Sequence, residues 1–269
     1  MPDSRDAGST LRSLHAKNGG VRAIFSSKVA DYVASRPNYP AALLDALRAL
    51  ACTAPNGGCV ADIGAGTGLL TRGLLERGLK VFAVEPNAAM RAAADENLRH
   101  FSDYQSLDGG AESMPLPDAS IDLITAAQAF HWFDADAARA EFLRVLKPHG
   151  QVALIWNDRE TDPLQTALDA IFEKYGGAKR GALVDHENRQ AVPRFFGTGA
   201  MRKMTYSNEQ QLDEAGLSCL VFSRSYIPDR DSALAPEVTA EVQRIFRDMA
   251  FGGTVTVRYQ TIAIIGQPA

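Results

Sequence analysis

The sequence predicts an α/β fold with a mostly parallel sheet, and three segments carry the prediction. Residues 60–78, VADIGAGTGLLTRGLLERG, have the pattern of a buried strand, a glycine turn and a helix. Residues 81–85, VFAVE, read as a second strand that ends in an acid. Because a crossover through a helix returns the chain to a parallel neighbour, these two strands are expected side by side. Residues 121–126, IDLITA, are apolar enough for a central strand that is buried on both faces.

Residues 1–22 are polar with several glycines and are expected to form a mobile N-terminal arm, whereas residues 23–269 are expected to form a single domain. A helical pattern runs over residues 24–50 and is interrupted by Pro37 and Pro40. One helix should therefore end near Ser35 and the next begin at Pro40 or Ala41, with a rigid turn between them.

The alternation of strands and helices continues after the second strand. Asn87 is a suitable N-cap for the next helix, and a short strand is expected at 104–107. Asp134 caps the helix after the central strand, and QVALIW at 151–156 follows as a further strand. Residues 162–174 look helical, and a polar, glycine-rich stretch extends from there to about residue 204. The region of about 160–210 is therefore expected to be an inserted lid, and the last two strands are expected at 220–226 and 254–265.

The glycine turn has the composition of a cofactor site. Gly64, Gly66 and Gly68 allow a ligand to approach the backbone closely, because glycine has no Cβ. The dinucleotide fingerprint requires a glycine where this chain has Leu69, and no Walker lysine follows, so a phosphate-rich ligand is disfavoured. Glu85 ends the second strand and is expected to accept hydrogen bonds from the two hydroxyls of a ribose.

Asp62 completes the pattern acid-x-G-x-G-x-G, and with it the chain resembles the class I S-adenosylmethionine (SAM) methyltransferases. The resemblance implies a Rossmann-like, seven-stranded, mostly parallel sheet with helices on both faces and an antiparallel last strand. It also implies SAM as the cofactor. Two shorter patterns, R-P-x-Y-P at 36–40 and S-x-S-Y-x-P at 223–228, resemble the type 11 small-molecule subgroup that is related to trans-aconitate methyltransferases.

The resemblance also implies cofactor contacts. Asp62 is expected to hold the ammonium group of the methionine part or to orient N–H groups of the turn. Arg36 is expected to pair with the cofactor's carboxylate; the alternative is a surface arginine in a proline-stiffened connection. The family often has an acid where this chain has Gly110, which leaves the Ala111 N–H and Glu112 to contact the adenine. The predicted cofactor-binding residues are Arg36, Asp62, Gly64, Ala65, Gly66, Gly68, Glu85, Pro86, Ala111, Glu112 and Gln128.

Ligands of open α/β sheets bind beyond the carboxyl ends of the strands, so residues 128–133 and 156–159 are expected to flank the transferable methyl group. His131 is a candidate general base; the alternative is a histidine that packs beside Trp132 and only shapes the pocket. From residue 179 to residue 203, six basic residues stand against two acids, which predicts either a basic lid for an anionic substrate or a solvated surface segment. The predicted substrate-binding residues are Tyr39, His131, Trp132, Trp156 and Asn157.

The composition of the chain argues against several classes of partner. The net charge of −4 and an isoelectric point near 5.8 argue against a general nucleic-acid binder. No apolar run reaches the roughly 20 residues that span a bilayer, so no membrane association is expected. The three cysteines and five histidines are scattered, which predicts no metal site and is typical of a reduced cytoplasmic protein. A monomer or homodimer is expected.

These observations predict a cytoplasmic SAM-dependent methyltransferase that acts on a small molecule by in-line displacement. Family analogy and the basic segment favour a carboxylate as the acceptor. One alternative is an N- or C-methyltransferase of secondary metabolism, in which His131 would serve as a base. The other is a SAM-binding regulator without catalytic turnover.

Overall fold

The computed structural model describes residues 28, 31, 35–52, 58–186 and 189–269. Contacts divide the chain into two compact units. We call residues 38–158, 189–208 and 260–269 the sheet unit, and we call residues 159–188 and 209–259, together with the described residues up to 37, the helical unit. The expected N-terminal arm at 1–22 lies outside the described residues.

The sheet has seven strands in the order β3-β2-β1-β4-β5-β7-β6. The strands β1 (Cys59–Ile63), β2 (Lys80–Val84), β3 (Tyr104–Leu107), β4 (Ile121–Ala127) and β5 (Leu146–Arg159) pair in parallel. The last strand, β7 (Val255–Gly266), is antiparallel and lies between β5 and β6 (Met201–Leu212). The predicted α/β fold with a mostly parallel, Rossmann-like sheet is therefore confirmed.

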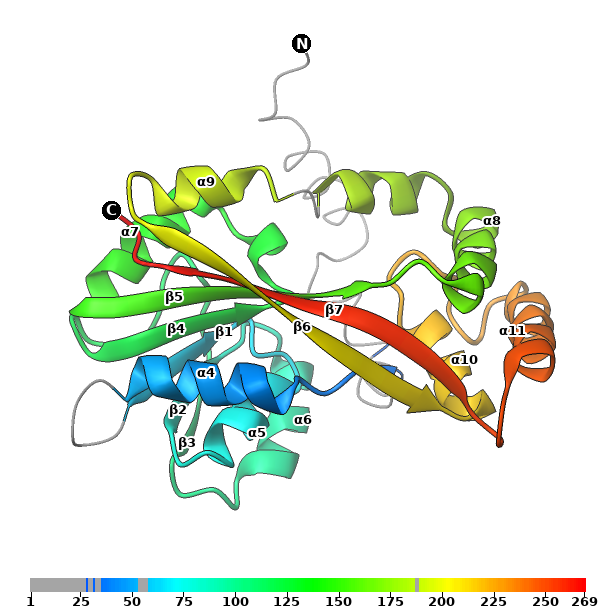
Figure 1. The fold of residues 1–269 in the computed structure, drawn as a ribbon, viewed down its shortest axis with the longest axis horizontal. Helices are drawn as coiled ribbons and strands as arrows, with labels where there is room; N and C mark the ends of the chain where they lie inside the picture. The colour runs from blue at the N-terminus through cyan, green and yellow to red at the C-terminus, as the bar shows by residue number, and fades with distance from the viewer. Residues whose placement is uncertain (1–27, 29–30, 32–34, 53–57, 187–188) are drawn as a thin grey trace, which may run out of the picture. The chain divides into compact units, whose positions relative to one another are not determined.

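Helices cover both faces of the sheet unit (Figure 1). The strands alternate their side chains between two cores: Val60 packs in one and Ala61 in the other. The first core is completed by α4 (Ala41–Ala51), α5 (Leu69–Leu75) and α6 (Ala88–Leu98), and the second by α7 (Ala135–Val145) and α9 (Ala191–Phe196). A short 3-10 helix, η1 (Phe130–Trp132), follows β4.

Several predicted helix boundaries are confirmed. The Asn87 side chain accepts hydrogen bonds from two N–H groups at the start of α6, and the Asp134 side chain does the same for α7. Ser35 is the last helical residue before the proline turn, and α4 begins directly after Pro40. These boundaries were predictable because capping and proline effects act over a few residues of the same segment.

The strand expected at 220–226 is wrong. Residues 220–222 belong to α10 (Glu214–Phe222), and the strand is β6 instead. The strand β6 is polar and at least partly exposed along most of its length, so it lacks an apolar signal, whereas the apolar run of α10 is buried in a helical core and suits either type of element. The helix expected at 162–174 begins as predicted but continues as α8 (Pro163–His186), with a kink at Gly177.

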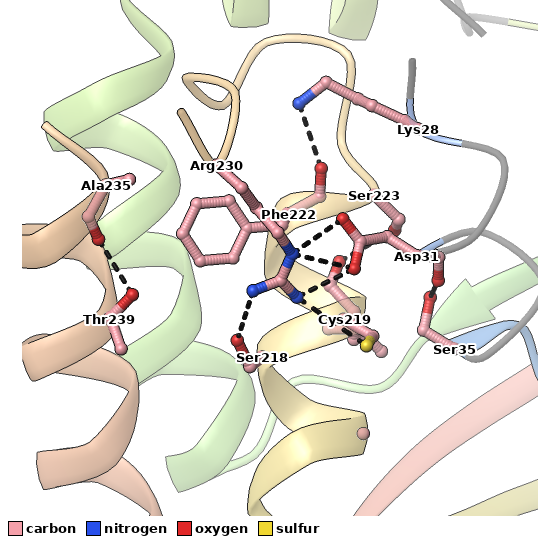
Figure 2. Close-up of polar contacts among 12 residues, drawn as sticks. Lys28, Asp31, Ser35, Ser218, Cys219, Phe222, Ser223, Arg230, Ala235 and Thr239 are labelled. Atoms are coloured by element: carbon pink, nitrogen blue, oxygen red, sulfur yellow. Dashed lines mark hydrogen bonds and ion pairs between the residues drawn. The ribbon is translucent and has the colours of Figure 1, made fainter. Parts of the chain in front are cut away.

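The helical unit packs α8, α10 and α11 (Ala235–Met249) around one apolar core. Lys28, one of the described N-terminal residues, binds oxygen atoms of this unit (Figure 2). Its Nζ donates hydrogen bonds to the carbonyls of Phe222 and Ile227, at 2.9 and 2.8 Å, and pairs with Asp229 at 3.2 Å. Burial lowers the pKa of Lys28, although Asp229 opposes the shift. Lys28 thus satisfies the carbonyl of Phe222, the last residue of α10, which the helix leaves unpaired.

Within the part of the chain that the structure describes, no helix is both long and apolar enough to cross a membrane.

Candidate functional site

The glycine turn joins β1 to α5 in a left-handed backbone conformation. The φ angles of Gly64 and Gly66 are +68° and +59°. A Cβ on Gly64 would lie 2.7 Å from the Cβ of Ala129, so this position requires glycine for space as well as for backbone conformation. Among the residues that the structure describes, a Cβ on Gly66 would meet nothing within 4 Å. The chain therefore turns tightly at Gly64 and leaves open space beside Gly66.

The structure brings Glu85 to the glycine turn. The register of β1 and β2 pairs Ile63 with Val84, so the residues that follow each strand are neighbours. One carboxylate oxygen of Glu85 accepts the N–H of Gly66 at 2.9 Å, and the other accepts the N–H of Asn87 at 2.8 Å. Glu85 therefore joins the glycine turn to the start of α6.

Arg91 is a residue of this site that sequence reasoning missed. Its guanidinium donates a hydrogen bond to the backbone carbonyl of Glu85 at 2.7 Å and pairs with Asp108 at 3.0 Å. Arg91 lies one turn after the cap residue Asn87, and this helical spacing was the signal that could have identified it. Arg91 therefore holds the backbone of Glu85 in place.

Asp62 is buried in the sheet unit and binds two threonines. Its carboxylate accepts the hydroxyl of Thr71 from α5 at 2.7 Å and that of Thr125 from β4 at 2.8 Å. Burial raises the pKa of Asp62 to about 6, although both hydroxyl hydrogen bonds oppose the shift. The turn's N–H groups donate elsewhere: those of Gly64 and Ala65 donate to the carbonyl of Val84. The N–H groups of Gly64, Ala65 and Gly66 are therefore held by Val84 and Glu85, and the two roles expected for Asp62 stay predictions.

Gln128 and Asn157 meet at the carboxyl ends of β4 and β5. Gln128 has a φ of +55°, which is unusual for a residue other than glycine, and its N–H donates to the carbonyl of Ile155 at 2.8 Å. Its side-chain amide donates to the backbone carbonyl of Asn157 at 3.3 Å. The Asn157 side chain accepts the hydroxyl of Thr261 at 2.6 Å. Strained backbone of this kind is frequent at functional sites, and here hydrogen bonds hold it in place.

Aromatic residues surround this edge of the sheet unit. His131 and Trp132 lie in η1 with their ring centroids 4.9 Å apart. Trp156 is almost fully buried, and its ring is covered by the guanidinium of Arg189 at 4.4 Å. Arg189 also pairs with Asp158. Sequence reasoning placed Arg189 only in a basic stretch, and its contact with Trp156 depends on the tertiary fold.

The remaining predicted residues have varied surroundings. The Glu112 carboxylate accepts the N–H of Asp134 at 2.8 Å and so contacts the start of α7, while Ala111 beside it is buried. Tyr39 packs against the core that contains α4. Arg36 belongs to the helical unit, whereas the other predicted cofactor and substrate residues all belong to the sheet unit.

Ion pairs neutralise part of the expected basic lid. Arg189 pairs with Asp158 and Arg194 with Asp136. Arg180 lies 3.2 Å from the carboxylate of Asp169 and 3.5 Å from that of Glu173. Half of the six basic residues between 179 and 203 therefore have acidic partners in the structure, which favours the surface-segment interpretation for these three.

Comparisons with known proteins identify the family. The family described as "Methyltransferase domain" matches residues 61–154, which extend from β1 into β5. An uncharacterized methyltransferase of Mycobacterium tuberculosis is 37% identical over 207 residues, which cover 75% of this chain and 76% of that protein. The chain belongs to this methyltransferase family. An uncharacterized methyltransferase of Schizosaccharomyces pombe is similar to it at 34% identity, over 83% of this chain and 87% of that protein.

The fold of this methyltransferase has solved counterparts. The structure of a candidate type II methyltransferase from Anaeromyxobacter dehalogenans superimposes with a TM-score of 0.60 at 26% identity, over 87% of this chain and 99% of that one. The enzyme is a SAM-dependent methyltransferase. The glycine turn fits this cofactor, because the space beside Gly66 is open among the described residues and a carboxylate, which accepts hydrogen bonds from hydroxyls, lies next to it.

Replacing Gly66 with alanine tests whether the space beside it receives the cofactor. Gly78 is the matched control, since its φ is +73° and a Cβ there would also meet nothing within 4 Å. Both Gly66→Ala and Gly78→Ala should lower the free energy of unfolding by about 1–2 kcal/mol, because each forces alanine into a left-handed conformation. Only Gly66→Ala should weaken the binding of S-adenosylhomocysteine, by at least about tenfold (about 1.4 kcal/mol) in calorimetric titration. Equal affinities for the two variants would contradict the assignment.

The raised pKa of Asp62 predicts a specific pH dependence of stability. Because the folded pKa of about 6 exceeds the unfolded value of about 3.9, the folded state binds this proton more tightly. The stabilisation that the proton provides is present at low pH and is lost as pH rises through 6. Between pH 5 and pH 8, the wild type should lose about 1 kcal/mol of unfolding free energy relative to Asp62→Asn, measured by urea denaturation. Parallel pH profiles for the two proteins would show that Asp62 does not titrate in this way.

Proposed function

We propose that this enzyme methylates a carboxylate oxygen of a small-molecule acceptor. The patterns at 36–40 and 223–228, which resemble the subgroup related to trans-aconitate methyltransferases, support this choice. The structural observation that carries it concerns three acids near the carboxyl edge of the sheet. Glu112 accepts the N–H of Asp134, Asp134 caps α7, and Asp158 pairs with Arg189. Since each of these carboxylates already accepts a hydrogen bond or pairs with an arginine, we assign none of them as a general base. The proposed acceptor is therefore one that is ionised at neutral pH and needs no base.

The chain's own residues hold and orient the reactants in this proposal. When bound, SAM supplies a methyl group on a positively charged sulfur, which takes the electron pair of the C–S bond as the acceptor oxygen forms its bond to carbon. Glu85 and the open backbone beside Gly66 hold the nucleoside part. Gln128 and Asn157, fixed by their hydrogen bonds at the ends of β4 and β5, orient the acceptor. Positioning and exclusion of water then provide most of the rate acceleration.

His131 favours a second candidate function. It lies in η1, which follows β4 after two residues, at the edge of the sheet where we expect the acceptor, and an imidazole can take the proton of a nucleophile that must lose one. An N- or C-methyltransferase would use it in this way. A SAM-binding regulator without turnover is the third candidate.

We also propose the compartment, the kind of partner and the oligomeric state of the enzyme. Cys52, Cys59 and Cys219 are free thiols, which supports a reducing compartment and hence the cytoplasm. The net charge of −4 supports a small molecule rather than a nucleic acid as the partner. We retain the predictions of a monomer or homodimer and of a single domain with an N-terminal arm at 1–22 and an insertion at about 160–210.

The acceptor chemistry can be tested through the stability of the product. The enzyme is incubated with methyl-labelled SAM and, separately, with small carboxylates, phenols and amines. A methyl ester releases labelled methanol in mild alkali, whereas N-methyl and C-methyl products do not. We expect labelled product from a carboxylate and its loss in alkali. Alkali-stable label would support the second candidate, and cofactor binding without transfer to any acceptor would support the regulator.

The role of His131 can be measured independently. For a carboxylate acceptor, His131→Gln should change kcat by less than about tenfold and leave the pH profile between 6 and 8 unchanged, because no proton is removed. Loss of a true general base lowers the rate by about 100-fold or more and abolishes the corresponding pH dependence. Steady-state rates across this pH range distinguish the two cases, and an unchanged affinity for S-adenosylhomocysteine verifies that the cofactor site is intact.

A further inference from the structure

Two arginines of the helical unit converge on one phenylalanine. Arg159 is the last residue of β5, Arg224 follows α10, and Phe172 projects from α8 into the apolar core. The guanidinium carbons of Arg159 and Arg224 lie 5.1 and 6.0 Å from the centroid of the Phe172 ring. Tyr226 meets the same ring edge-on at 5.8 Å. The two positive charges are thus held beside apolar and aromatic surface rather than in open solvent.

Neither charge has a described acidic partner. Arg159 donates a hydrogen bond to the neutral side chain of Gln165 at 3.2 Å, and the Nε of Arg224 is buried without a hydrogen-bond partner. Among the residues that the structure describes, no carboxylate forms an ion pair with either arginine. Other arginines of the same unit are paired: Arg230 with Asp31 at 2.7 Å and Arg258 with Glu209 at 3.3 Å. The two arginines at Phe172 therefore form a positive cluster without an ion pair among the described residues.

Both arginines are partly buried. A partly buried charge without an ion pair is costly, and the stacking on Phe172 offsets only part of that cost. Burial lowers the pKa of Arg159; Tyr259, Tyr226 and the more distant carboxylate of Asp169, which forms no ion pair with it, oppose the shift, while the positive charge of Arg36 adds to it. An arginine nevertheless stays charged at neutral pH. A bound anion would remove the cost, and a planar carboxylate matches the geometry of the guanidinium group.

We propose that Arg159 and Arg224 form an anion-binding site of the helical unit, with the Phe172 ring as its apolar wall, and that this site binds a small carboxylate. The site is argued from the helical unit alone and does not depend on the proposed function.

The site is tested on the full chain by calorimetric titration with succinate, citrate and inorganic phosphate at constant ionic strength. The variants are Arg159→Gln and Arg224→Gln, and the matched control is Arg258→Gln, whose arginine has acidic partners in the same unit. We expect at least one carboxylate to bind the wild type and the control, and each variant to weaken that binding at least tenfold. The affinity for S-adenosylhomocysteine should be the same in all four proteins.

Thermal unfolding without ligand separates the site from a purely structural role. Removing a charge without an ion pair should leave the melting temperature of either variant unchanged or higher, whereas removing a stabilising stacking contact would lower it. Failure of both carboxylates to bind the wild type, or equal binding by the variants, would overturn the site. Tighter binding of phosphate than of either carboxylate would overturn the carboxylate assignment. If the anion site is verified but the transferred label is stable in alkali, the proposed function fails and the site stands.

Discussion

The buried carboxylate of Asp62 is the constraint on which the cofactor half of this enzyme depends. A carboxylate at the end of a central strand requires hydrogen-bond donors, and the chain supplies them from α5 through Thr71 and from β4 through Thr125. This arrangement fixes the start of α5 close to the end of β1, so the turn between them must be tight. The positive φ values of the turn glycines follow from this geometry, and so does the open space beside Gly66.

Glu85, which follows the second strand β2, also has a carboxylate that is held by hydrogen bonds. Its two oxygens accept N–H groups from Gly66 and Asn87, so one side chain joins the glycine turn to the start of α6. Truncation of Glu85 to alanine would therefore leave two backbone donors without their acceptor as well as removing a ligand contact. Weaker cofactor binding by that variant would not isolate the ribose contact, which is why the matched glycine pair is the cleaner test of the site.

Local signals decided which parts of the fold could be predicted from the sequence. The caps at Asn87 and Asp134 and the glycine turn depend on a few neighbouring residues, and the sequence contains that information directly. The strand β6 was missed because its side chains are mostly polar and its place in the sheet depends on pairing with distant β7. The helix α10 was mistaken for a strand because an apolar run that is buried on most sides has no clear period.

The basic residues that are most conspicuous in the sequence are not the ones that we assign to anion binding in the structure. The basic residues between 179 and 203 form the most conspicuous positive segment in the sequence, yet three of them pair with acids in the fold. Arg159 and Arg224 are 65 positions apart and form no basic cluster in the sequence, but the fold brings both to the ring of Phe172, where no described acid pairs with them. An anion responds to the charge that remains after internal pairing, and that quantity is defined only by the three-dimensional structure.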